Sequence, residues 1–325
     1  MKIKMDNPDT EDDEKVHFRI GSALDCQLTS PELWDEKFLV IEATRPMGFM
    51  GKFIDNLPSG LDPLLSDISL YQEAYDKAGY KMSINKVIEK MWNTPELIHY
   101  YLSTRNIDKD KSVISKDEYE QVMKAKELLL ANEFTERYFR TSEDTDGIYE
   151  LLTQVPIYFR HLGEDCKALL DGILINHEAK TIQIYDLKTT GKSVYAFESA
   201  YLDYGYYRQI AFYSIALRHI LELYPRLEGY LVLNPVFIVV ETKLSSTHPA
   251  VIYEVKDREF GYLGGTVKGK RYKGIAELIN AYKFHRDNDY WDMPKDLYDN
   301  KGVIELNVFD EEPKPFSTDT LIETI

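Results

Sequence analysis

The spacing of apolar residues changes three times along this chain, and each change predicts a different kind of element. From Phe18 to Leu28 apolar residues recur at mixed intervals of three and four, which predicts a helix with one buried face. Residues 36–42 (EKFLVIE) predict a short strand. The stretch 55–140 then reads as a block of helices, and from residue 150 the pattern turns mainly to strands.

The helical block shows recognisable start signals. Helices are predicted around 66–78 and 83–92. Thr94-Pro95 supplies an N-cap followed by proline at the first helical position, and this helix should reach about Arg105. Ser115 and Glu118 form a capping-box pattern for a helix running to about Glu133. We therefore expect a helical insertion at about 55–140.

The remainder predicts an α/β domain. Strands are expected at 155–159, 167–175 and 181–189, followed by a long helix from about Tyr204 to Leu223. Two further strands are expected at 229–242 and 250–256, and a final helix at 270–289. This order is typical of a mixed central sheet flanked by helices. We expect one domain over 17–300, a flexible acidic tail at 1–16, and an irregular C-terminal segment at 301–325.

Composition favours an intracellular protein. The 325 residues are 44% apolar and 29% charged, a globular balance, and no run approaches the roughly 20 apolar residues of a membrane span. The N-terminus lacks the apolar core of a secretory signal. Cys26 and Cys166 are too few for a disulfide framework. We therefore expect a cytoplasmic location, without membrane association.

The net charge of −16 argues at first against nucleic-acid binding, which depends on lysine and arginine. Binding follows the local field rather than the average, however, and bound cations reverse the sign of a carboxylate cluster. Acidity alone therefore does not exclude a metal-dependent enzyme that acts on DNA.

Acidic residues interrupt two strands that should otherwise be apolar. Asp171 breaks the run KALLDGILI, and Asp186 and Lys188 lie two residues apart in IQIYDLKTT. Side chains at i and i+2 share one face of a strand, so Asp186 and Lys188 should point the same way, with Tyr185 on the other face. If the two strands form a hairpin, Asp171 comes near Asp186.

Two carboxylates beside a lysine suit phosphodiester hydrolysis. Asp171 and Asp186 would hold Mg²⁺, which takes oxygen ligands, and the carbonyl of Leu187 could complete the shell. The metal polarises the phosphoryl oxygen and helps generate hydroxide. Lys188 would orient or deprotonate the attacking water and offset developing negative charge. The alternative interpretation is an Asp–Lys pair on an exposed strand face, with Asp171 in a turn.

The order and spacing of these residues resemble a known family. D(171)-G-I-L-I, then I-Y-D(186)-L-K(188)-T-T, then R-Q(209)-I-A-F-Y(213), resembles the RecB/RecE-like branch of the PD-(D/E)XK nucleases. Gln209 and Tyr213 are four residues apart and so share a helix face. The resemblance implies that this face turns to the active site and the DNA backbone, and that the domain has the restriction-endonuclease-like α/β core.

The resemblance extends to the N-terminal segment. I-G-S-A-L-D(25)-C-Q-L-T-S-P-E-L-W-D-E-K-F resembles the first motif of phage-type RecE-like exonucleases, with Asp25 where many relatives carry histidine. Asp25 is then a third metal-binding acid. Gln154 in Q(154)-V-P-I-Y-F stands where relatives often carry glutamate, and it is expected to support the metal ligands from behind. The helices at 55–140 match the insertion that such phage proteins often contain.

The resemblance implies a Mg²⁺-dependent exonuclease acting on double-stranded DNA in phage recombination or DNA processing. It implies one or two ions in each site, with Mn²⁺ as a substitute, and a host-cell cytoplasmic location if the protein is phage-encoded. A single-strand annealing protein is the implied partner. Two alternatives are a structure-specific endonuclease of the same fold and a catalytically silent module that binds DNA or protein.

An acidic chain needs a local basic lining to reach DNA. We expect Arg208, beside Gln209, and Lys192, just after the D-L-K-T-T strand, to contact the DNA. The stretch Lys268–Lys273 (KGKRYK) is the strongest local cationic patch, and it is either a phosphate contact or a solvated loop. If several subunits form a homo-oligomeric ring, their clefts would line a positive channel.

Overall fold

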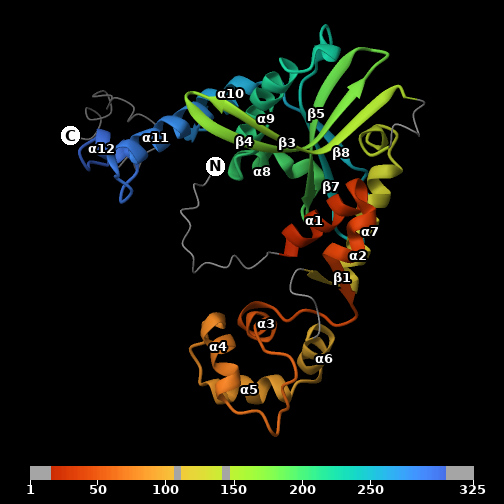
Figure 1. Ribbon diagram of the computed structural model, residues 1–325, viewed down its shortest axis with the longest axis vertical. Helices are drawn as coiled ribbons and strands as arrows, with labels where there is room; N and C mark the ends of the chain where they lie inside the picture. Colours follow the sequence, from red (N-terminus) through yellow and green to blue (C-terminus); the bar gives the residue numbers. More distant parts are fainter. Residues whose placement is uncertain (1–15, 106–110, 141–146, 305–325) are drawn as a thin grey trace, which may run out of the picture.

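A computed structural model describes residues 16–105, 111–140 and 147–304 of the chain. Residues 1–15 and 305–325, which hold nearly all of the expected acidic tail and most of the expected C-terminal segment, lie outside the described residues. The main body contains the central sheet, and a group of small helices lies at the far end of the long axis (Figure 1).

The central sheet is mixed, as the strand pattern predicted. Its main path runs β3 (Tyr149–His161), β4 (Glu164–Asn176), β5 (Thr181–Thr190), β7 (Val236–Glu241) and β8 (Val251–Glu254). The first three strands are antiparallel, β7 is parallel to β5, and β8 is antiparallel to β7. The short strand β6 (Leu231–Val232) pairs with β5 in parallel.

Helices cover both faces of this sheet. The connection from β5 to β7 runs through α8 (Phe197–Asp203) and α9 (Tyr206–Leu221), and α9 packs on one face through residues such as Ile210 and Leu217. On the other face, α1 (Val16–Thr29) and α7 (Lys116–Leu130) enclose a second core with Leu174, Tyr185 and Ile238. The sheet therefore separates two apolar layers.

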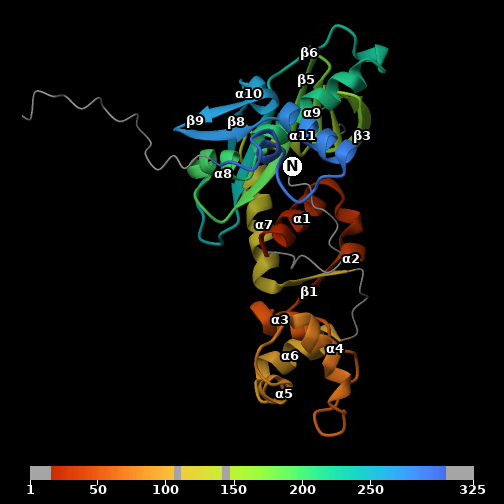
Figure 2. The same cartoon turned by 90° about the vertical axis from the view of Figure 1, so that its left-hand side faces the viewer.

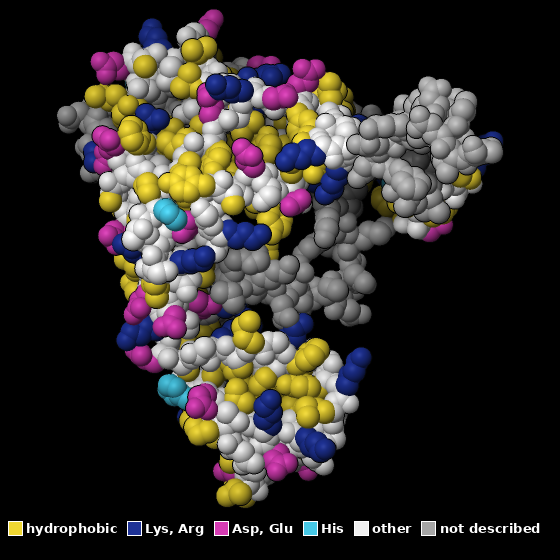
Figure 3. Space-filling view, turned by 180° about the vertical axis from the view of Figure 1, so that it is seen from behind, with side chains coloured by type: hydrophobic (Ala, Val, Ile, Leu, Met, Phe, Trp, Pro, Cys, Tyr) yellow, Lys and Arg dark blue, Asp and Glu magenta, His cyan; other side chains and the backbone are white. Residues whose placement is uncertain are grey.

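The insertion, defined here as α3 (Gly48–Asp55), α4 (Ser69–Ala78), α5 (Ile84–Trp92) and α6 (Pro95–Thr104), has a hydrophobic core of its own. It joins the main body through β1 (Phe38–Ile41) and β2 (Ser112–Ser115), which form a separate parallel pair. Both ribbon views place it below the sheet (Figures 1 and 2). From behind, its surface shows hydrophobic side chains interspersed with lysine and arginine (Figure 3).

The structure differs from the predicted elements in several places. The strand expected at 36–42 forms, but it pairs with β2 outside the central sheet. The capping box of Ser115 and Glu118 is present, yet α7 packs on α1 in the main body rather than with the insertion. The expected strand 229–242 is divided around Pro235, which has no N–H to donate to a ladder.

The C-terminal region was predicted as one helix at 270–289, and this prediction is wrong for the first four residues. Lys270–Lys273 form β10, which pairs with β9 (Gly264–Val267) in an antiparallel hairpin, and only then does α11 (Ile275–Asn288) begin. The short helices α10 (Arg258–Leu263) and α12 (Lys295–Asp299) flank these elements. We call β9, β10 and their turn the basic hairpin, because it contains the stretch Lys268–Lys273.

Candidate active site

The β4–β5 hairpin brings Asp171 and Asp186 to neighbouring positions. The regular pairing ends where Gly172 stands opposite Tyr185, one residue before Asp171 and Asp186 would face each other. There the side chain of Asp171 replaces a backbone acceptor, because its Oδ2 receives a hydrogen bond of 3.0 Å from the Leu187 amide. The two strands thus separate at the acids, and a side-chain carboxylate fills the gap.

The glycine after Asp171 has a clear steric role. A Cβ at Gly172 would lie 2.0 Å from the ring of Tyr185, so only glycine lets this ring lie across β4. Tyr185 is buried and makes edge contacts with Tyr138 and Phe139. The D-G pair of the sequence motif therefore combines a candidate metal-binding acid with the space that a core aromatic residue requires.

Asp186 is fully buried, with 0% of its surface exposed, and two side chains on the α9 side of the sheet contact its carboxylate. Lys188 forms an ion pair with its Oδ2, and the Gln209 side-chain amide donates to its Oδ1 at 2.9 Å. Gln209 also lies 2.9 Å from the hydroxyl of Tyr213, one helical turn further along α9. The Q-x-x-x-Y pair of the sequence therefore faces Asp186 directly.

Asp25 approaches from α1, on the opposite side of the sheet from α9. Its Oδ1 accepts a hydrogen bond of 2.9 Å from the side-chain amide of Gln154. Thr153 pairs with Gly172 and Val155 pairs with Leu170, which leaves Gln154 opposite Asp171 and outside the regular pairing.

Gln154 has a left-handed backbone, with φ of 50°, a conformation that costs a residue with a side chain about 1–3 kcal/mol. Its neighbours Leu152 and Val155 both pack on the α9 core, so β3 switches faces at this residue. The irregularity turns the amide of Gln154 toward Asp25 and places strain directly beside Asp171.

The electrostatics of this group, which we call the acid cluster (Asp25, Asp171 and Asp186 with Lys188), are dominated by burial. Burial, and then the charge of Asp186, raises the pKa of Asp171 to about 7. Burial also raises the pKa of Asp186 against the opposing effect of Lys188, and that of Asp25 against the hydrogen bond from Gln154. Each acid thus holds a proton more tightly than it would in water.

Lys188 shows the complementary effect. Burial disfavours its charge, but the carboxylates of Asp186 and Asp171 outweigh burial and raise its pKa. One ammonium among three acids makes Lys188 permanently cationic, while an extra proton is shared within the acid cluster near neutral pH. The proton that titrates near neutral pH therefore belongs to the neighbouring carboxyls of Asp171 and Asp186 together.

Two site residues were not predicted from the sequence. The Lys188 ammonium lies 4.7 Å from the ring centre of Tyr206 and 5.8 Å from that of Phe237. Such contacts stabilise a cation and hold it in place. Tyr206 is the first residue of α9, three residues before Gln209, but the chain has 24 tyrosines and no motif distinguishes this one.

The two residues expected to contact DNA occupy different environments. Lys192 is exposed in the turn just after β5, where its backbone amide donates to the Thr190 hydroxyl at 3.0 Å. The Arg208 guanidinium instead donates to the hydroxyl of Tyr207 and to the backbone carbonyl of Lys273. Arg208 thus fastens the start of α9 to the basic hairpin.

The donor set fits a hard divalent cation such as Mg²⁺. Within the described ranges, no three His, Cys, Asp or Glu side chains converge closely enough to hold a metal ion on their own. Asp186 Oδ2, however, is buried with the Lys188 ammonium as its ion-pair partner, and Asp171 lies beside it on β4. The N–H and C=O of one strand residue point to the same side, so the Leu187 carbonyl faces Asp171 as its amide does. Two carboxylates, one carbonyl and waters form an ordinary Mg²⁺ shell.

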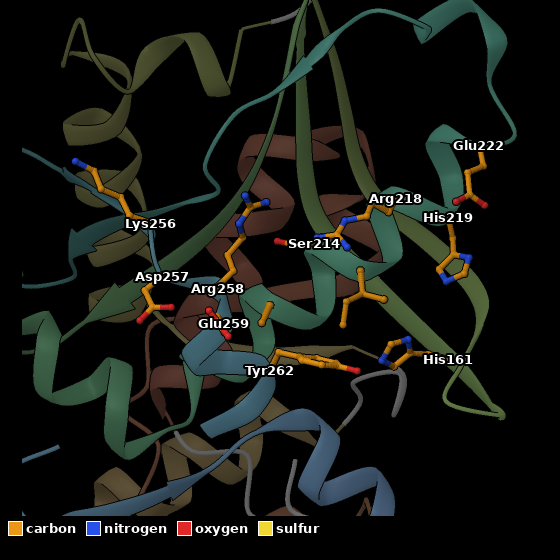
Figure 4. Close-up of a pocket in the computed structure, with 12 residues that line it drawn as sticks. His161, Ser214, Arg218, His219, Glu222, Lys256, Asp257, Arg258, Glu259 and Tyr262 are labelled. Carbon is orange, nitrogen blue, oxygen red and sulfur yellow. The ribbon is translucent and has the colours of Figure 1, made fainter. Parts of the chain in front are cut away.

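A cavity of about 740 Å³ lies elsewhere, between the C-terminal half of α9, α10 and the end of β3 (Figure 4). It contains none of the residues of the acid cluster. Its basic residues Arg218, Lys256 and Arg258 are matched in number by Glu222, Asp257 and Glu259. With this balanced lining, the cavity shows no preference for an anionic ligand, and size alone does not make it the active site.

Comparison with known proteins does not identify the function of this chain. Neither the models of known protein families nor the curated proteins contain a match to this chain. In the part of the chain that the structure describes, no helix combines the length and apolarity needed to cross a membrane.

Proposed function

We propose that the protein is a Mg²⁺-dependent deoxyribonuclease of the PD-(D/E)XK type, acting as an exonuclease on double-stranded DNA. The observation that carries the proposal is the convergence of Asp171, Asp186, Lys188 and Gln209 at the point where β4 and β5 separate. These residues are the ones that the family resemblance implies, and they come from two strands and a helix. A mixed sheet with a helical insertion also agrees with that resemblance.

Each residue has a role that its contacts define. Asp171, Asp186 and the Leu187 carbonyl would hold the metal, which when bound supplies Lewis-acid stabilisation of the phosphoryl group. Gln209 fixes the orientation of Asp186 through a direct hydrogen bond. Asp25, held by Gln154, would stand beside this site as a further acid, although its side chain does not converge with Asp171 and Asp186 closely enough to complete a three-acid metal site.

Lys188 could either orient the attacking water or deprotonate it. Its raised pKa favours the first, because a lysine that keeps its proton donates hydrogen bonds and offsets negative charge. Cation–π contacts with the rings of Tyr206 and Phe237 help to hold the ammonium in position. Lys188 therefore acts as a fixed cation beside the attacked phosphate.

The test is a digestion assay with Mg²⁺ on linear and covalently closed circular duplexes of one sequence. An exonuclease degrades the linear form alone, whereas the alternative endonuclease also opens circles that carry a flap or junction. Absence of Mg²⁺-dependent cleavage on every substrate would overturn the proposal and leave the silent binding module. An Asp186→Asn variant purified in parallel controls for a contaminating nuclease.

A further inference from the structure

The turn between α8 and α9 exposes an aromatic ring next to the acid cluster. Tyr204 is the C-cap residue of α8 and is 71% exposed, although its ring contacts that of Tyr206. The next residue, Gly205, has φ of 72°, and a Cβ there would meet the Arg208 guanidinium at 2.2 Å. The turn is thus fixed by the packing beneath it, while Tyr204 itself remains open to solvent.

A continuous row of side chains leads from Tyr204 to the acids. The ring of Tyr204 lies 5.7 Å from that of Tyr206, at 39°. Tyr206 stacks on Phe197 on its buried side and contacts the Lys188 ammonium, as described above. Tyr204 is therefore the exposed end of an aromatic row whose other end is the Lys188–Asp186 pair.

The basic hairpin lies on the other side of this turn. Lys270 forms an exposed ion pair of 3.8 Å with Asp203, the residue before Tyr204. Arg208 and Tyr207 both donate to the Lys273 carbonyl, so the hairpin is tied to the first turn of α9. Tyr204 thus lies between a cationic hairpin and the acid cluster.

The lysine and arginine side chains of the basic hairpin differ in whether they form ion pairs with acidic residues. Arg271 and Lys273 are paired with Glu277 and Asp296. Lys268 is exposed at the tip and has no ion-pair partner among the described residues, while the Lys270–Asp203 pair is long and solvated. Pairs of this kind contribute little to stability, so a phosphate can replace Asp203 at small cost.

We infer that an unpaired strand of DNA runs along this surface, from the basic hairpin across Tyr204 to the acid cluster. The inference rests on the proposed function for the choice of DNA as the ligand. Lys268 and Lys270 would contact the phosphates, and one base would stack on the exposed ring of Tyr204. Single-strand sites in general combine a cationic track with aromatic platforms in this way.

An exposed aromatic ring favours an unpaired strand over an intact duplex as the ligand. Within a duplex, base faces are covered by their neighbours, so an aromatic side chain can stack only on a terminal or unpaired base. The arrangement therefore implies that the terminal nucleotides separate from their complement before they reach the acids. The substrate of the site is the frayed end of one strand.

The experiment measures binding in Ca²⁺ with EDTA-treated protein, using a labelled single-stranded oligonucleotide of about 12 nucleotides, within the usual length range of such sites. Tyr204→Ala should weaken binding roughly tenfold, and Tyr204→Trp should retain it, because base stacking requires only an aromatic face. The matched control is Tyr224→Ala, since Tyr224 is 46% exposed just beyond the other end of α9. A 2-aminopurine base should be quenched by the wild type and not by Tyr204→Ala.

Lys268→Ala combined with Lys270→Ala should reduce the salt dependence of the same binding. Wild-type affinity in Tyr204→Ala, or no binding of the oligonucleotide by the wild type, overturns the inference. Tyr204-dependent binding without cleavage on any duplex supports this site and overturns the proposed nuclease. If the protein cleaves linear duplex and Tyr204→Ala cleaves it equally well, the proposed nuclease is supported and this strand-binding site is overturned. Because Tyr204 is exposed, unfolding temperatures should be unchanged and should verify that each variant is folded.

Discussion

The insertion and the main body differ in the kinds of side chain that they bury. Among the described residues, every buried polar or charged side chain lies in the main body, including Arg19, Glu118, Asp186 and Glu241. The insertion core contains only apolar and tyrosine side chains. Its buried tyrosines also have partners, since Tyr100 donates to Asp55 and Tyr101 donates to the Pro58 carbonyl.

The difference shows that buried polar groups that lower the stability of the fold lie in the main body. The insertion satisfies its polar groups and places no acid in its core. The main body leaves the buried hydroxyl of Tyr185 without a hydrogen-bond partner and raises the pKa of several acids. Strained and under-satisfied groups of this kind concentrate at functional sites. The comparison thus favours the main body as the place of a functional site, independently of any motif.

The largest expected effect is on cleavage. Asp186→Ala and Lys188→Ala should each lower kcat by about 10²-fold or more, because they remove groups that act on the transition state. Asp55→Asn is the control, an acid that is hydrogen-bonded in the insertion and should leave kcat within about twofold. Near-normal turnover in a folded Asp186→Ala or Lys188→Ala protein would contradict the assignment.

The next effect is on the stability of the insertion. Phe53 is fully buried in its core, so Phe53→Ala should cost about 3–5 kcal/mol. Amide hydrogen exchange should accelerate in α3–α6 while β5 keeps its protection, and cleavage at low temperature should persist. Equal acceleration in β5 would show that the two cores unfold as one unit.

A smaller effect concerns pH. The pKa of Asp171 is about 7 in the folded protein and near 4 in the unfolded chain, so the folded state binds this proton more tightly. Its contribution to stability is therefore present at low pH and is lost as the pH rises from about 4 to about 7. In EDTA, Asp171→Asn should be more stable than the wild type at pH 8, by on the order of 1–2 kcal/mol after allowance for solvent screening.

Denaturant unfolding at pH 4 and pH 8 measures this difference, which should nearly vanish at pH 4. Added Mg²⁺ should stabilise the wild type at pH 8 and have much less effect on Asp171→Asn, because a bound ligand stabilises only the state that binds it. The same stability difference at both pH values would exclude Asp171 as the titrating group.

The smallest effect concerns surface charge. Lys192→Glu should weaken duplex binding in Ca²⁺ by a few fold, since Lys192 is exposed just beyond the strand that carries Asp186. Lys86→Glu, an equally exposed lysine in the insertion, should have no measurable effect. Equal losses would mean that binding follows net charge rather than a local surface.

The hydrophobic pattern predicted much of the fold. The two-residue alternation around Asp186 and Lys188 gave the correct face, and the capping box of Ser115 and Glu118 gave the start of α7. The hairpin that brings Asp171 toward Asp186 formed as expected. These successes share a cause, because periodicity and capping are local properties of the sequence.

The features that escaped prediction depend on distant contacts. Gln154 was expected behind the metal ligands, but its left-handed backbone and the switch of faces in β3 arise from the packing of α1 and β4 around it. Tyr206 was missed because its contact with Lys188 joins residues from different elements. Arg208 faces the basic hairpin, which the expected helix at 270–289 had concealed.

The amide of Leu187 gives the acid cluster a built-in spectroscopic reporter. In most strands the neighbouring backbone carbonyl fixes the environment of an amide, whatever the pH. Here the acceptor is the Asp171 carboxyl, which takes up a proton near neutrality. The Leu187 N–H resonance should therefore shift with pH and with added divalent cation, while the resonances of Ile182 and Ile184, within the regular ladder, stay still. One nuclear spin would then follow protonation and metal binding separately from catalysis.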